Sequence, residues 1–209
     1  FTLGVTGSHI KTPENEVWQW VFSPRADIGY RISPSFMLKA GFTQANMPPS
    51  IGQVSGDSAF HNQNIIVHGN PELVGGRANQ TTFNVVYHNK WLNINVSYSY
   101  LYYKNPIDYY YQYEQPYIAY SPINDNWADV HSVHYDLRLS PFKNDLLALK
   151  LGGGFSYTKV DSKVLGRVTH FQAPMYYELT FNYKNFSAYY QGAIPCKGLS
   201  IPMIYDSEL

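Results

Sequence analysis

Two histidines and two aspartates lie close together in the stretch DVHSVHYD, residues 129–136, and their side chains are of the types that bind metal ions. Imidazole nitrogens and carboxylate oxygens are common zinc ligands. On an extended strand, however, side chains three positions apart point to opposite faces, so His131 and His134 cannot chelate one ion together. His134, Asp136 and Arg138 share a face, and this predicts a small network of mixed charge rather than a metal site.

A tyrosine-rich segment is the second place where residue types suggest binding. Residues 104–128 have the sequence KNPIDYYYQYEQPYIAYSPINDNWA. Aromatic rings on a water-exposed loop can stack on sugars or flat chelates, and binding residues favour loops held by a rigid scaffold. The alternative is that these rings pack the loop against its neighbours. The candidate ligand-binding residues are Tyr109, Tyr110, Tyr111, Tyr113, Tyr117 and Trp127, and the segment containing Trp18 and Trp20 is a weaker candidate.

Catalytic motifs give no comparable signal. The sequence has no Gly-x-Ser-x-Gly elbow, no His-Glu-x-x-His pair and no glycine loop of the kind that cradles phosphates. The single cysteine, Cys196, excludes an internal disulfide framework and a paired-cysteine metal site. We therefore expect no enzymatic activity and no cofactor.

The composition narrows the class of protein. Aromatic residues make up 17% of the 209 residues and 20 of them are tyrosines, whereas charged residues make up only 14%, well below the roughly 25% of soluble globular domains. The net charge is zero and the cations are scattered, which excludes a nucleic-acid-binding surface. No run of about 18 apolar residues is present, which excludes a transmembrane helix but leaves transmembrane strands open.

Apolar and polar residues alternate with a period of two, which predicts about nine antiparallel strands. The clearest strand is 91–102, and others are predicted at 26–32, 36–42, 133–139, 147–157 and 177–183. Strands of about ten residues can cross the hydrocarbon layer when tilted. Their apolar faces end in rings suited to the membrane interface, and the candidates are Trp91, Tyr98, Tyr100, Tyr102, Tyr103 and Tyr157.

The polar faces carry Asn, Ser, Thr, Gly and a few charges of both signs. A soluble sandwich would expose Lys and Glu more freely on its outer faces, so this pattern favours a barrel with a watery interior. A soluble carbohydrate-binding sandwich remains the alternative. The charged residues predicted to face the interior are Asp27, Arg31, Lys39, His134, Asp136, Arg138, Lys150 and Glu178.

The connectors alternate between short and long. Tight turns are predicted at 33–35, 88–90, 141–145 and 183–185, and long polar connectors at 9–21, 46–78, 104–128 and 160–172. Short turns at one end and long loops at the other are typical of an outer-membrane barrel. The predicted fold is therefore an all-β, antiparallel up-and-down transmembrane barrel.

The stretch HGNPELVGG, residues 68–76, ends one of these long connectors. Gly69 is expected to adopt a conformation closed to other residues, Asn70 to bond its neighbouring backbone, and Pro71 to end the loop. The order of strand, loop, Gly-Asn-Pro-x-Leu element and alternating hairpin resembles the barrel of TonB-dependent outer-membrane receptors of the Bacteroidetes type. Gly69, Asn70, Pro71 and Leu73 match the family's element, whereas Val74, Gly75 and Gly76 replace its usual continuation.

The resemblance implies a function. Such receptors sit in the outer membrane of Gram-negative bacteria and import scarce iron chelates, cobalamin or oligosaccharides through a 22-stranded barrel, using a plug domain and energy from the TonB complex. Residues 1–209 then correspond to part of the barrel domain, without the plug, and the start lacks a Met and a signal peptide, as processing or truncation would leave it.

The resemblance also assigns roles and partners. The charged interior residues would contact the plug or, less directly supported, the cargo, and the partners would be the lipid bilayer, the TonB complex, the cargo and a surface lipoprotein. The open alternative is a self-contained small barrel that acts as an adhesin or a passive pore.

Overall fold

The structure is a computed structural model of the chain. It describes residues 23–142 and 146–194 in full, and it describes the backbone of the short strands at 2–4, 8–11, 16–19, 197–200 and 203–206. The predicted positions of Trp20 and Cys196, the side chain of Trp18, and part of the 141–145 turn lie outside the described residues.

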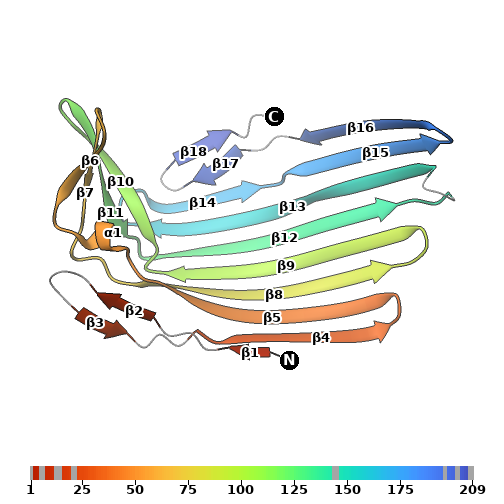
Figure 1. Cartoon of the computed structure of the whole chain (residues 1–209), viewed down its shortest axis with the longest axis horizontal. Helices are drawn as coiled ribbons and strands as arrows, with labels where there is room; N and C mark the ends of the chain where they lie inside the picture. Colours follow the sequence, from red (N-terminus) through yellow and green to blue (C-terminus); the bar gives the residue numbers. More distant parts are fainter. Residues whose placement is uncertain are drawn as a thin grey trace.

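The main sheet has ten strands in the described part of the chain, and each neighbour in the path is antiparallel (Figure 1). The spatial order is β1-β4-β5-β8-β9-β12-β13-β15-β16, with β14 on the far half of β13. This arrangement confirms the predicted up-and-down fold. The bounds are β1 Thr2–Gly4, β4 Arg25–Ser33, β5 Phe36–Met47, β8 Gly76–His88, β9 Leu92–Lys104, β12 Trp127–Leu139, β13 Leu147–Ser162, β14 Gly166–Gln172, β15 Met175–Tyr183 and β16 Phe186–Ile194.

Strands β14 and β15 both pair with β13, each along a different half of it. Ser156–Ser162 of β13 pairs with β14 and Leu147–Gly153 pairs with β15. Pro174 lies between the two and has no N–H to donate, so the ladder breaks there. The Pro174 carbonyl still accepts a hydrogen bond from the Gly154 N–H at 2.9 Å, which holds the interrupted strand on the sheet.

Three predicted tight turns lie at one end of the sheet (Figure 1). They join β4 to β5, β8 to β9 and β15 to β16, as predicted, and β12 ends and β13 begins at the same end. At the opposite end the connectors 48–75 and 105–126 are long, but they are not irregular loops. They contain α1 (Ile51–Val54), β6 (Ser58–Asn62), β7 (Ile65–His68), β10 (Ile107–Glu114) and β11 (Tyr117–Asn124).

The prediction of a long connector at residues 160–172 is wrong. Residues 160–162 complete β13, a turn at 163–165 follows, and β14 begins at Gly166. The outward residues here are Lys159 and Asp161, while Val160 between them is 2% exposed. The apolar and polar residues thus exchange faces near the end of β13, although the ladder continues without a break.

A four-stranded sheet rises at the end with the long connectors, in the order β10-β11-β7-β6 (Figure 1). Strand β11 runs parallel to β7, whereas the other pairs are antiparallel. We call it the loop sheet. Apart from Ala148 on β13, the buried apolar residues gather at and near its junction with the main sheet, and they include Leu73, Ala78, Ala119, Pro122, Ala128 and Val160.

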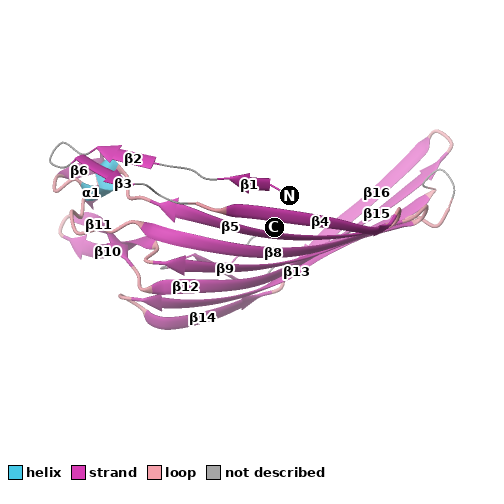
Figure 2. Cartoon of the chain, turned by 90° about the horizontal axis from the view of Figure 1, so that it is seen from below, coloured by secondary structure: helices cyan, strands magenta, loops and turns pink. Residues whose placement is uncertain are grey.

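The main sheet is a single curved layer with two different faces (Figure 2). Register sets Val85, Val96 and Tyr135 side by side on one face, as the alternation predicts. On this outward face Ile28 and Phe83 are 63% and 53% exposed, so the described residues supply no second layer of protein above it. Among the described residues, no helix is long and apolar enough to cross a membrane.

The Gly-Asn-Pro element closes the connector between β7 and β8. The Asn70 side chain accepts from the Glu72 N–H at 3.0 Å, as expected, and its amide also donates to the Pro122 carbonyl at 2.9 Å. The expectation for Gly69 is wrong, because its φ is not positive. Glycine is needed there because an added Cβ would lie 1.5 Å from the Ser55 carbonyl oxygen.

The remaining described elements are two short hairpins. Strand β2 (Ser8–Lys11) pairs with β3 (Glu16–Gln19), so the predicted connector 9–21 contains paired backbone. Near the other terminus β17 (Lys197–Ser200) pairs with β18 (Met203–Asp206).

Candidate functional site

Toward the end with the long connectors, the outward face of the main sheet carries a continuous row of mostly aromatic residues. Ladder pairing places six residues side by side across six strands, and they are Phe42, Thr81, Tyr100, His131, Tyr157 and Phe171. His131 joins this row through ring contacts, with its centroid 4.7 Å from that of Tyr100, and its Nδ1 lies 2.8 Å from the Tyr98 hydroxyl. Tyr103 is not part of the row, because it pairs with Ala78 and Ala128 on the inner face.

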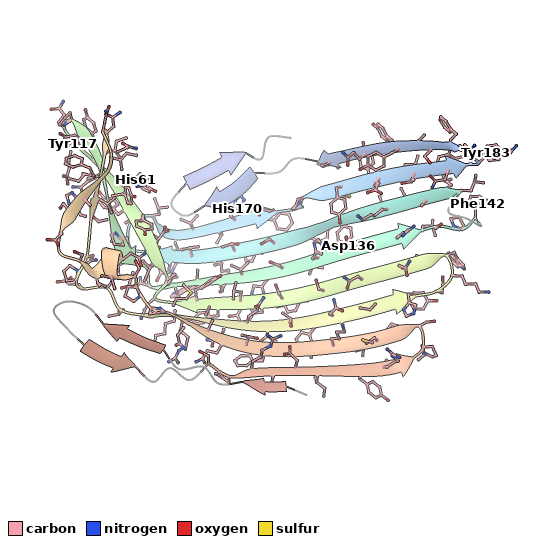
Figure 3. All side chains as sticks on the ribbon, in the orientation of Figure 1. His61, Tyr117, Asp136, Phe142, His170 and Tyr183 are labelled. Atoms are coloured by element: carbon pink, nitrogen blue, oxygen red, sulfur yellow. The ribbon has the colours of Figure 1, made fainter. Side chains whose placement is uncertain are left out.

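The inner face carries the predicted charged residues. Asp136 lies on β12, in the middle part of the main sheet (Figure 3). It receives a hydrogen bond from the Tyr176 hydroxyl, and its other oxygen lies 3.1 Å from His134 Nε2. Lys150 lies 3.9 Å from Glu178 and 5.7 Å from the Tyr176 ring centroid. His134 and Asp136 therefore interact as predicted, and the contacts of Tyr176, Lys150 and Glu178 extend this group across three strands.

A shallow hollow of about 410 Å³ opens beside this network, toward the tight-turn end of the sheet. Asp136, Arg138, Lys150 and Glu178 line it together with amide and hydroxyl side chains. The other predicted interior charges lie apart from it. Asp27 pairs instead with Arg25 at 2.7 Å, and Arg31 and Lys39 lie on β4 and β5.

The glycines of LGGGFSY make room for the network. A Cβ at Gly152 would lie 2.1 Å from the Tyr176 ring, which is its direct partner across the ladder. The sequence predicts a close approach at these glycines but not its occupant, because Tyr176 is 24 positions away. The ring lies over the glycine, and its hydroxyl thereby reaches Asp136.

The six candidate ligand-binding residues do not form one cluster. Tyr109, Tyr111 and Tyr113 alternate with Tyr110 along β10, so three rings lie on one face of the loop sheet and Tyr110 on the other. Tyr117 pairs with Glu114 and shares the face of Tyr110. Trp127 is the first residue of β12, on the outward face of the main sheet rather than on a loop.

Tyr120 of β11 packs against this three-ring face from the neighbouring strand. Its ring centroid lies 5.3 Å from that of Tyr109 and 5.5 Å from that of Tyr111. Burial, together with these two neighbours, raises the pKa of the Tyr120 hydroxyl. Farther out along β10, Tyr113 is 69% exposed, so this face is packed at its base and open at its tip.

The opposite face of the loop sheet carries a polar chain that sequence analysis missed. Ser58 Oγ lies 2.6 Å from His68 Nδ1, and His68 Nε2 lies 3.2 Å from Glu114. Hydrogen bonds from Gln112 and His68 lower the pKa of the Glu114 carboxyl. Three different strands supply these residues, so no sequence spacing could have revealed them.

A second hollow, of about 390 Å³, lies on the inner face below the loop sheet. Tyr103, Ala128 and Val130 line it on the main sheet, and Asp108 and Asp125 line it from above. Burial raises the pKa of Asp108 to about 6, and the charge of Asp125 adds to the effect. Asp125 accepts a hydrogen bond from the Lys163 N–H at 2.8 Å.

Metal ligands do not gather in either region. Within the residues that the structure describes, His, Cys, Asp and Glu form no group of three or more suited to an ion. Both His131 and His134 have other partners, on opposite faces of β12.

Comparison with known proteins gives a family and a set of structural neighbours. Residues 1–193 match the family model described as TonB dependent receptor-like, beta-barrel. No match is found among curated protein sequences.

The structural neighbours share the fold. A copper transporter, OprC, is 13% identical with a TM-score of 0.63 over 80% of this chain and 25% of that one. A ferric enterobactin receptor variant from Pseudomonas aeruginosa, in complex with enterobactin, is 17% identical with a TM-score of 0.60 over 85% of this chain and 28% of that one. The siderophore receptor PirA from the same organism is 14% identical with a TM-score of 0.53, over 84% and 38%. The chain thus spans well under half the length of each.

Proposed function

The chain belongs to the TonB-dependent receptor-like β-barrel family, and from this premise we propose that it forms part of a receptor that imports a scarce solute across the outer membrane. The energy comes from the TonB complex through a plug domain. The assignment to the Bacteroidetes type rests on Gly69, Asn70, Pro71 and Leu73 alone.

The observation that carries the proposal is the contrast between the two faces of the main sheet. Its outward face exposes large apolar side chains such as Ile28 and Phe83, whereas its inner face holds the hydrogen-bonded network around Asp136. Such a wall separates hydrocarbon from a polar interior. The charged inner residues are then available to contact the plug, and the hollow beside Asp136 and Lys150 is the place where a plug side chain or water would fit.

Cargo capture is assigned to the three-ring face of the loop sheet. Tyr111 and Tyr113 are 45% and 69% exposed there, and the packed pair of Tyr109 and Tyr120 holds β10 in place behind them. Exposed rings on a rigid base suit a solute with flat or ring-shaped groups, such as an aromatic iron chelate or a sugar. The related receptors of siderophores and copper make a metal chelate the first cargo class to test.

The test is uptake by cells that express the full-length receptor, with and without an active TonB complex. Radiolabelled ferric chelates, cobalamin and oligosaccharides serve as the panel of solutes. We expect one class to accumulate only with TonB, and the Tyr111→Ala/Tyr113→Ala variant to weaken its binding by about tenfold, since stacked rings contribute roughly 0.5–1.5 kcal/mol each. Tyr110→Ala, on the opposite face, is the matched control. Accumulation that does not depend on TonB would show a passive pore instead.

A further inference from the structure

Two cations face each other directly on the outward side of the main sheet. Arg77 at the start of β8 pairs in the ladder with Lys104 at the end of β9, and both side chains are exposed. Like charges directly opposite each other on adjacent strands destabilise a sheet. Neither side chain has a hydrogen bond or an ion pair within the described residues.

The positions of Arg77 and Lys104 relative to the row that contains Tyr100 and Tyr157 indicate their depth in the membrane. Arg77 and Lys104 lie four residues beyond Thr81 and Tyr100 along their strands, which is about 13 Å along the strand and less along the membrane normal of a tilted barrel. Aromatic belts lie at the level of the lipid head groups. The two cations therefore lie at the outer edge of the head-group layer, at the end that carries the long connectors.

The same band contains further cations that point outward. Lys159 on β13 lies two residues beyond Tyr157, with its ammonium 5.4 Å from that ring centroid. Arg167 on β14 lies 3.8 Å from Asp161 and has an 81% exposed side chain. On the inner side of these strands Ala78 and Val160 are buried, so the four cations lie on the opposite, outward face.

We infer that Arg77 and Lys104 bind a phosphate group of a phosphorylated glycolipid in the outer leaflet, and that Lys159 and Arg167 continue this contact on β13 and β14. A phosphate between the two cations neutralises their repulsion, and a guanidinium can donate two parallel hydrogen bonds to it. The surface is separate from the proposed cargo site and from the inner network.

The experiment uses the full-length receptor in a neutral detergent, titrated with diphosphorylated lipid A and with the same glycolipid after removal of its phosphates. Native mass spectrometry measures the bound lipid. The wild type is expected to bind the phosphorylated form at least about tenfold more tightly, as two exposed ion pairs together allow, and the difference is expected to shrink at high salt. Equal binding of the two forms would overturn the inference without reference to any variant.

Variants locate the contact. Arg77→Gln/Lys104→Gln is expected to lose the preference for phosphate, whereas Arg77→Lys/Lys104→Arg keeps it. The control is Lys90→Gln/Lys184→Gln, which removes two cations at the tight-turn end. An unchanged preference in the first variant, or an equal loss in the control, would contradict the assignment. TonB-dependent uptake is expected to continue in all of them, which separates this result from the proposed function.

Discussion

Tyr176 and Gly152 illustrate how single residues shape the inner face. The ring occupies the space that a Cβ at position 152 would need, and its hydroxyl bonds Asp136. Sequence analysis identified Asp136 and His134 as one polar group, because strand alternation alone sets their side. It could not identify Tyr176 as their partner, because that contact depends on the register between β13 and β15.

The first prediction concerns Gly152→Ala. The added methyl group forces the Tyr176 ring to move and breaks its bond to Asp136, which we expect to cost about 1–3 kcal/mol, as overpacking usually does. The thermal unfolding midpoint of the full-length receptor measures the effect. Gly29→Ala is the control, since a Cβ there meets only ordinary contacts at 3.9 Å and beyond. Equal losses in both variants would refute this account of the glycine.

The second prediction concerns Asp108, whose pKa is raised by burial from 3.8 to about 6. The folded loop sheet holds this proton more tightly than the opened segment does, so the contribution of Asp108 to its stability is fully present below pH 3.8 and is lost as the pH rises through about 6. Hydrogen exchange of residues 107–114, corrected for intrinsic rates, should show this loss. Asp108→Asn should remove it and increase protection at pH 7. Wild-type protection that rises through this window would contradict the argument.

At the scale of elements, the loop sheet depends on a few buried amides. Asn124 is 8% exposed, accepts from the Val74 N–H at 2.8 Å, and donates to the Val74 and Asn105 carbonyls at 3.0 and 3.1 Å. One side chain thus ties β11 to the segment before β8 and to the end of β9. Buried polar groups of the backbone are costly when they lose such a partner.

The third prediction follows from these bonds. Asn124→Ala should destabilise the loop sheet by about 2–3 kcal/mol, from the lost bonds and the unpaired Val74 groups. Faster hydrogen exchange is expected in 65–76 and 107–124, with β9 and β12 unchanged. Asn126→Ala is the control, because Asn126 is exposed and makes one side-chain bond, to Asp161 at 3.1 Å. An equally large change across the main sheet would show that the two sheets unfold together.

Strands could be predicted from the sequence only where one face of the sheet meets an apolar environment and the other a polar one. Leu92, Ile94 and Val96 alternate with polar residues because one face meets lipid and the other water. Residues 107–124 show no such contrast, because the four tyrosines of β10 are divided between its two faces. The four strands of the loop sheet therefore gave no alternation of apolar and polar residues from which to predict them. The parallel contact between β7 and β11 also joins segments more than 50 positions apart.

At the scale of the whole molecule, the chain is a stretch of barrel wall with a second sheet standing at its outer end (Figure 2). The composition made this class of fold predictable, because rings are abundant and charges are few. The family match confirms it over residues 1–193. The proposed selection of cargo rests on Tyr111 and Tyr113 of the loop sheet.

The central claim is that successive side chains of the main sheet face lipid and a polar interior by turns. Single cysteines at positions 92–97 of β9, in a full-length Cys196→Ser background, can carry a bimane fluorophore in membranes that contain nitroxide-labelled lipid. We predict strong quenching at Leu92, Ile94 and Val96, and weak quenching at Asn93, Asn95 and Ser97. Uniform quenching, or quenching with the opposite alternation, would contradict the account.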